Sequence, residues 1–297
     1  MTRRARAQST DIDHYNAAAR ASSATVIDAY STSFGLATRL LSPTVRSQVR
    51  TVYALVRIAD EIVDGAATGA GLDAAAQREQ LDDLERETER AIRGGYSTNL
   101  VVHAFAGTAR SVGIGSRLTA PFFASMRRDL DLSPFTEAGV AEYIYGSAEV
   151  IGLMCLRCFV REAPVAAADL PALQGGARRL GAAFQKVNFL RDLACDLDTL
   201  GRNYFPGVDV TRMTDAEKNR ILDHIDADLV AAGHVLPLLS GGSRRAVTLA
   251  HHLFSRLSAR LRATPAQQLL RARVRVPDAE KLAIAVAATL GSGMWKR

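Results

Sequence analysis

Two pairs of aspartates have the residue type and spacing that point most clearly to chemistry. Asp60 and Asp64 lie four positions apart, and Asp192 and Asp196 repeat that spacing far downstream. On a helix, residues i and i+4 share one face, so each pair would present two carboxylates side by side. At about 4 Å in a protein-like dielectric, their repulsion costs on the order of 4 kcal/mol. A divalent cation such as Mg²⁺, which prefers carboxylate and phosphate oxygens, would offset that repulsion.

A single pair with this spacing is most often a solvated helix face, and that interpretation stands beside the metal hypothesis. Apolar residues nevertheless surround both pairs, with Ile62 and Val63 between the first two aspartates and leucine and alanine between the second two. Such a pattern indicates an amphipathic helix with a narrow polar face, whose remaining surface packs against a core. Arg57 and Arg191 stand close to the pairs and could add forked contacts to phosphate.

The composition favours helices and excludes several classes of protein. Hydrophobic residues make up 48% of the 297 residues and aromatic residues only 6%. No alternating strand pattern, glycine-rich nucleotide signature or H-E-x-x-H spacing occurs in the sequence. The net charge of +6 suggests acidic ligands or an anionic surface, with nothing that indicates nucleic acid. We therefore predict one all-α domain.

The elements that must position the aspartates are long predicted helices. Proline suits a first helical turn, so Pro43 is expected to open a helix of about twenty residues that carries the first pair and ends at Gly65. The second pair lies on a helix predicted over 172–198, and Thr214 begins another with a capping box. A long helix should run from Pro134 to about Val160. Further helices are predicted over 14–40 (broken near 31–33), 73–93, 98–112, 116–131, 243–263 and from 277 onward.

The ends of the chain and its cysteines carry less information. Residues 1–13 are expected to form a disordered basic tail before a single domain over 14–297. No apolar run is expected to reach the roughly 20 residues of a membrane span, so a cytoplasmic protein is expected, with peripheral membrane contact at most. The three cysteines include Cys155-x-x-Cys158, but no second pair completes a zinc site, and the surroundings indicate a buried helix.

Several segments together resemble the squalene/phytoene synthase family of head-to-head prenyl condensing enzymes, from about Tyr30 to Lys281. The most specific is the second acidic motif with its G-R-x-Y-x-P continuation. The matching segments are Tyr30–Phe34, Tyr53–Asp64, Tyr143–Tyr145 with Ile151-Gly152, Gln185–Asp196, Gly201–Pro206 and Arg273–Pro277 with Lys281.

The resemblance implies an isoprenoid-synthase-type helical bundle around a central cavity. It implies Mg²⁺ or Mn²⁺ held by Asp60, Asp64, Asn188, Asp192 and Asp196. It assigns catalysis to the four aspartates and Tyr143. It assigns substrate binding to Ser33, Tyr53, Arg57, Gln185, Asn188, Arg191, Arg202, Tyr204 and Arg273. No NADPH is expected, since no nucleotide signature is present.

The function implied is condensation of two geranylgeranyl diphosphates to phytoene through prephytoene diphosphate, in a monomer or weak homodimer. Alternatives are a squalene or dehydrosqualene synthase that uses farnesyl diphosphate, and a non-catalytic relative that acts as a scaffold. A class I terpene cyclase or chain-elongating prenyltransferase is disfavoured by the spacing of the second motif. The chain departs from the family pattern at Glu149, where a small residue is usual, and at Thr32, Lys186, Val187 and Cys195.

Overall fold

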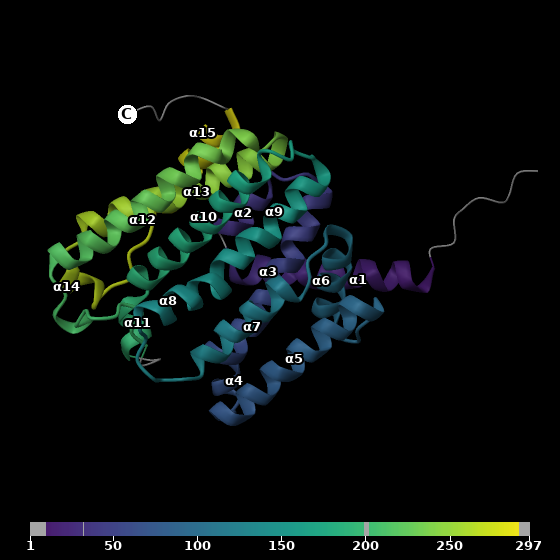
Figure 1. The fold of residues 1–297 in the computed structure, drawn as a ribbon, viewed down its shortest axis with the longest axis horizontal. Coiled ribbons are helices and arrows are strands. Elements are labelled where there is room, and N and C mark those ends of the chain that lie inside the picture. Colours follow the sequence, from purple (N-terminus) through teal and green to yellow (C-terminus); the bar gives the residue numbers. More distant parts are fainter. Residues whose placement is uncertain (1–9, 32, 199–201, 291–297) are drawn as a thin grey trace, which may run out of the picture.

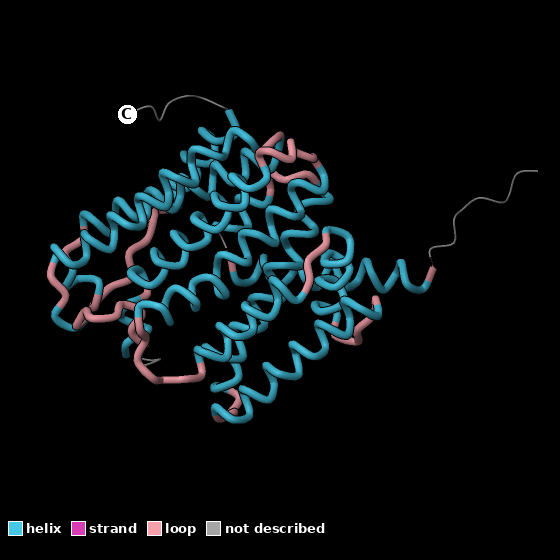
Figure 2. Tube along the Cα trace, in the orientation of Figure 1, coloured by secondary structure: helices cyan, strands magenta, loops and turns pink. Residues whose placement is uncertain are grey.

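Helices form every regular element in the part of the chain that the computed structural model describes, residues 10–31, 33–198 and 202–290 (Figure 1). Figure 2 shows only loops and turns between them. The predicted all-α fold is confirmed. The helices are α1 (Asp11–Tyr30), α2 (Ser33–Thr38), α3 (Pro43–Asp64), α4 (Ala66–Gly69), α5 (Ala74–Gly94), α6 (Leu100–Val112), α7 (Ser116–Asp129), α8 (Glu137–Ile144), α9 (Val150–Glu162), α10 (Leu170–Arg191), α11 (Leu193–Asp198), α12 (Asp215–Val235), α13 (Gly241–Ala263), α14 (Ala266–Leu269) and α15 (Asp278–Leu290).

The helix that carries the first acidic motif begins where the sequence predicts. Ser42 accepts a hydrogen bond from the N–H of Val45, and Pro43 occupies the first turn of α3. Such a cap satisfies one of the backbone donors that a helix start leaves unpaired. The helix ends at Asp64, before Gly65, so both motif aspartates lie in its last two turns.

The expected disordered tail over 1–13 reaches too far along the chain. Thr10 and Asp13 form a capping box in which each side chain accepts from the other's backbone N–H. This box starts α1 at Asp11, so residues 11–13 are helical. Residues 1–9 lie outside the described part of the chain.

The second acidic motif does not lie on one unbroken helix, as the sequence suggested. α10 ends at Arg191, Asp192 stands at the break, and α11 resumes at Leu193. The N–H of Asp196 still donates to the carbonyl of Asp192 at 3.0 Å. One helical turn therefore persists across the break and keeps the two aspartates near each other.

α8 and α9 form one helical rod with a π-helical turn, Tyr145–Glu149, between them. By length and composition Glu137–Glu162 could span a bilayer, which corrects the expectation that no such stretch exists. In this fold the rod packs between α7 and α10, where an apolar surface is buried by protein. Gly146 permits that packing, since a Cβ there would lie 2.1 Å from the carbonyl oxygen of Pro121.

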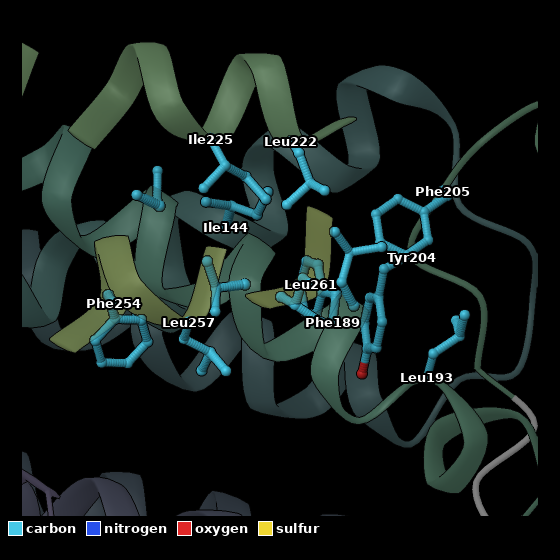
Figure 3. Close-up of a cluster of buried hydrophobic side chains, with 14 of the residues drawn as sticks. Ile144, Phe189, Leu193, Tyr204, Phe205, Leu222, Ile225, Phe254, Leu257 and Leu261 are labelled. Atoms are coloured by element: carbon cyan, nitrogen blue, oxygen red, sulfur yellow. The ribbon is translucent and has the colours of Figure 1, made fainter. Parts of the chain in front are cut away.

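The rod also approaches α10 backbone to backbone. A Cβ at Gly152 would lie 2.4 Å from the carbonyl oxygen of Ala177. On its other sides α10 packs against α12 and α13, which run beside it in Figure 1. Figure 3 shows the resulting cluster, with Leu222 and Ile225 of α12 above and Leu257 of α13 below. These contacts fix α10, and with it the second acidic motif, against the rest of the bundle.

Candidate active site

A single cavity of about 810 Å³ contains both acidic motifs. One end is polar and is lined by residues of α3, α7, α10, α11 and α15, of the break between α10 and α11, and of the segments after α11 and α14. The rest is mostly apolar and is walled by α2, α3, α9, α10, α12 and α13. The polar end includes Arg57, Asp60, Asp64, Asp129, Asn188, Arg191, Asp192, Asp196, Arg202, Arg273, Arg275 and Lys281. The arrangement would suit a ligand with an anionic head and a long apolar tail.

The carboxylates of the first motif lie in different electrostatic surroundings. Burial, followed by the nearby charge of Asp64, raises the pKa of Asp60 well above its ordinary value. Asp64 is more exposed and accepts a hydrogen bond from Arg202 at 2.6 Å. Arg57, the nearest arginine in sequence, instead pairs with Glu61. Of the two aspartates, Asp60 is therefore the one whose ionised form would gain most from a nearby cation.

The second motif shows the same division of roles. Asp192 accepts a hydrogen bond from its neighbour Arg191 at 2.5 Å and forms an ion pair with Nε of Arg273 at 2.6 Å. Burial and the charge of Asp192 raise the pKa of Asp196 to about 7. One turn before the break, the Oδ1 atom of Asn188 is buried and has no hydrogen-bond partner. Each motif thus pairs one aspartate with arginine and leaves the pKa of the other raised.

Asp129, at the end of α7, is a central residue of the site that the sequence analysis missed. Its side chain is 3% exposed and lies 3.0 Å from the hydroxyl of Tyr143 and 3.2 Å from that of Tyr204. Arg202 donates to its backbone carbonyl at 2.8 Å. Burial raises the pKa of Asp129 to about 7, although Arg202 opposes that shift. In the sequence, Asp129 follows two arginines at a helix end and resembles an ordinary surface charge.

The remaining predicted substrate-binding residues divide into those in the cavity and one that cannot be placed. Tyr53 and Gln185 line the cavity with Arg57, whose guanidinium lies 4.3 Å from the ring centre of Tyr30. Burial raises the pKa of the Tyr53 phenol. Ser33 begins α2, but its side chain lies outside the described part of the structure.

Two features noted in the sequence, Glu149 and the Cys155-x-x-Cys158 pair, lie apart from the polar end of the cavity. Arg178 donates a hydrogen bond to Glu149 at 2.6 Å, and its guanidinium lies 5.3 Å from the ring centre of Tyr145. Neither Glu149 nor Tyr145 is among the described residues that line the cavity. Glu149 therefore points away from the cavity, and its charge is paired with Arg178 of α10. Burial raises the pKa of Cys155 to about 12 and that of Cys158 further. Both thiols remain neutral, which is the opposite of a redox motif.

The carboxylate and amide oxygens at the polar end are the hard donors that Mg²⁺ prefers. Among the described residues, no three acidic, histidine or cysteine side chains already form an ion site. The unpartnered oxygen of Asn188 and the raised pKa of Asp60 and Asp196 nevertheless show where positive charge is lacking. The residues present therefore fit a divalent cation.

Comparisons of the sequence with known protein families and with individual proteins lead to the same family. The model of the family described as squalene/phytoene synthase matches residues 27–280. A 15-cis-phytoene synthase of a Paracoccus species is 31% identical over 180 residues, which are 60% of this chain and 56% of that protein. A phytoene synthase of Thermus thermophilus is 32% identical over 188 residues, 61% of this chain and 57% of that protein. The matched region thus spans little more than half the length of these relatives.

Solved structures show the same fold. A dehydrosqualene synthase superposes with a TM-score of 0.77 at 22% identity, covering 94% of this chain and 98% of that one. A squalene synthase from Alicyclobacillus acidocaldarius gives 0.70 at 18% identity, covering 84% and 94%. The predicted isoprenoid-synthase-type bundle around a central cavity is confirmed.

Proposed function

Because this chain belongs to the squalene/phytoene synthase family, we propose that it condenses two prenyl diphosphates head to head. The preferred substrate is geranylgeranyl diphosphate and the product is phytoene, formed through prephytoene diphosphate with release of diphosphate. One observation carries the proposal: both acidic motifs and several arginines line one end of a cavity of about 810 Å³ whose other walls are mostly apolar. A prenyl diphosphate has the same division between an anionic head and an apolar tail.

The charged residues at the polar end would bind and orient the diphosphates. Arg57, Arg191 and Arg273 line the cavity there and offer forked donors that match phosphate oxygens. Asp60, Asp64, Asn188, Asp192 and Asp196 would hold Mg²⁺ or Mn²⁺. When bound, the metal supplies positive charge that stabilises the departing diphosphate.

The apolar walls would hold the prenyl chains and keep water from the reactive carbons. Phe184 of α10 and Phe254 of α13 stack at 3.7 Å between ring centres within this wall. A carbocation released in such a chamber meets aromatic and aliphatic groups rather than solvent, which favours carbon–carbon bond formation over hydrolysis.

The named relatives and the solved structures differ in the length of the prenyl chain that they suggest. The relatives named phytoene synthases favour geranylgeranyl diphosphate. The solved structures of similar fold are named dehydrosqualene and squalene synthases, which keeps a farnesyl substrate as the second candidate. We further propose a cytoplasmic enzyme that contacts a membrane only to release its apolar product.

Incubation with each diphosphate, and product analysis, tests the proposal. Geranylgeranyl diphosphate with Mg²⁺ should give phytoene without NADPH, and exhaustive chelation should abolish turnover. Dehydrosqualene from farnesyl diphosphate alone, or squalene that requires NADPH, would move the assignment to the second candidate. Absence of diphosphate release with both substrates would leave the scaffold alternative.

A further inference from the structure

Asp129 is a buried carboxylate to which the proposed reaction assigns no role. It lines the polar end of the cavity, although it belongs to neither acidic motif. An ionised carboxylate in such a place is costly to bury unless its oxygens are paired. Its contacts therefore show what the fold uses it for.

Two of these contacts are tyrosine hydroxyls from different segments. Tyr143 of α8 donates to Oδ2 at 3.0 Å, and Tyr204, in the segment after α11, donates to Oδ1 at 3.2 Å. In its ionised form, which the guanidinium of Arg202 at 3.5 Å favours, the carboxylate only accepts hydrogen bonds and directs both hydroxyl hydrogens toward itself. The remaining phenol lone pairs are then available on other sides of each ring.

The rings of these tyrosines belong to an aromatic wall of the cavity. Tyr143 and Tyr204 stack with centres 5.3 Å apart, and Tyr204 stacks on Phe189 at 4.0 Å. All three rings line the cavity, and Figure 3 shows Phe189 and Tyr204 side by side in the core cluster. Aromatic faces carry negative charge density and attract cations.

The third partner ties Asp129 to the first acidic motif. Arg202 donates to the carbonyl of Asp129 at 2.8 Å and lies 3.5 Å from its carboxylate. The same guanidinium donates to Asp64 at 2.6 Å. One residue thus fixes both the aromatic wall and the arginine that pairs with a motif carboxylate.

We propose that Asp129 is a positioning residue for the condensation, which this inference takes as its premise. It fixes the hydroxyl direction of Tyr143 and Tyr204 and the place of Arg202, so that an electron-rich wall faces the cation left when diphosphate departs. Without the carboxylate, a tyrosine O–H could turn into the cavity, and the positive end of its dipole would oppose that cation. Groups oriented before the reaction contribute most to stabilising the charge that develops in it.

Asp129→Asn tests this role while preserving the size of the side chain. The amide nitrogen must face one of the two hydroxyls or Arg202, so at least one partner loses its orientation. We expect kcat to fall about 100-fold per folded molecule, with KM changed less than about threefold. We also expect a larger share of prenyl alcohols, which form when water captures a poorly stabilised cation.

Tyrosine variants separate positioning from a purely structural role. Tyr143→Phe should lower kcat in the wild-type background but change it less than about twofold in Asp129→Asn, because the hydroxyl acts through that carboxylate. Should Asp129→Asn fail to fold, Tyr143→Phe combined with Tyr204→Phe removes both hydroxyls and keeps Asp129. That double variant should show the same shift toward alcohols.

Wild-type protein is assayed first, so that the two proposals fail separately. Wild-type turnover with unchanged product shares and kcat in Asp129→Asn, accompanied only by a lower melting temperature, would overturn the positioning role alone. The same holds if the double phenylalanine variant keeps the wild-type products. A wild-type protein that makes no condensed product overturns the proposed function, and the role of Asp129 with it.

Discussion

Arg202 donates from Nη1 to Oδ1 of Asp64 at 2.6 Å, although 138 residues separate the two in sequence. The arginine side chain is 7% exposed, and it also donates to the backbone carbonyl of Val63 at 3.1 Å. The segment after the second acidic motif therefore reaches back and neutralises a carboxylate of the first. The two motifs belong to one network of charges, so a substitution in either motif should change the electrostatic environment of the other.

Replacing Arg202 should destabilise the fold. Arg202→Met keeps the length of the side chain but leaves Asp129 buried without a cation, and we expect a loss of about 3 kcal/mol in the free energy of unfolding. Urea denaturation in chelator measures it. The control is Arg86→Met, whose exposed pair with Asp83 should contribute less than about 0.5 kcal/mol. A loss below about 1 kcal/mol for Arg202→Met would mean that Asp129 is held protonated.

The four motif aspartates should matter for turnover rather than for folding. Asp60→Asn, Asp64→Asn, Asp192→Asn and Asp196→Asn should each lower the rate about 100-fold or more, because each removes charge that balances metal and diphosphate. Product formation and melting temperature are measured together. Near-wild-type turnover in Asp60→Asn and Asp192→Asn would contradict a site shared by the two motifs.

The control for that series must come from an unpaired surface position. Asp82, on the charged helix α5, is unsuitable because it accepts from Arg127 at 2.6 Å. Glu79 on the same helix is exposed, and Glu79→Gln should change neither rate nor stability by more than about 0.5 kcal/mol.

Stability in chelator should fall as the pH rises from 6.5 to 8. Asp196 titrates near pH 7 in the folded protein, because burial and Asp192 raise its pKa from 3.8. In this window the folded state holds a proton that the unfolded state has already lost, so its release destabilises the fold. The wild type should lose about 1 kcal/mol more than Asp196→Asn over this range.

Subtracting the pH profile of Asp196→Asn from that of the wild type cancels the contributions of other groups, including those that titrate in the opposite direction. His103, His251 and His252 have lowered pKa values from burial, so their contribution to stability rises with pH. Mg²⁺ should flatten the Asp196-dependent part, since a bound cation displaces the proton. Identical pH profiles for wild type and variant would show that Asp196 is already ionised at pH 6.5.

Gly152 should tolerate no side chain. A Cβ there would lie 2.4 Å from the carbonyl oxygen of Ala177, so Gly152→Ala must separate α9 from α10. We expect a loss of about 2 kcal/mol in the free energy of unfolding. The matched control, Gly107→Ala in α6, meets nothing within 4 Å and should instead stabilise by about 0.5 kcal/mol. A neutral Gly152→Ala would indicate that the two helices can separate at little cost.

Local signals in the sequence were enough for most of the fold. Pro43 with Ser42, and the capping box at Thr214, mark helix starts because they satisfy backbone donors within a few residues. The spacing of Asp60 and Asp64 indicated the first half of the site, because residues four apart on a helix are brought together by local structure alone. The break at Asp192 and the π-helical turn at Tyr145 carried no such signal.

The sequence by itself determined the helices, the paired carboxylates and the resemblance to one family. Only the tertiary structure decided which charges meet. Asp129 joins Tyr143, Tyr204 and Arg202 because the end of α7, the rod of α8 and the segment after α11 converge at one end of the cavity. Such contacts depend on how helices pack over long sequence separations. Burial there removes water that would otherwise screen each charge, so a carboxylate that looks ordinary in sequence becomes central to the site.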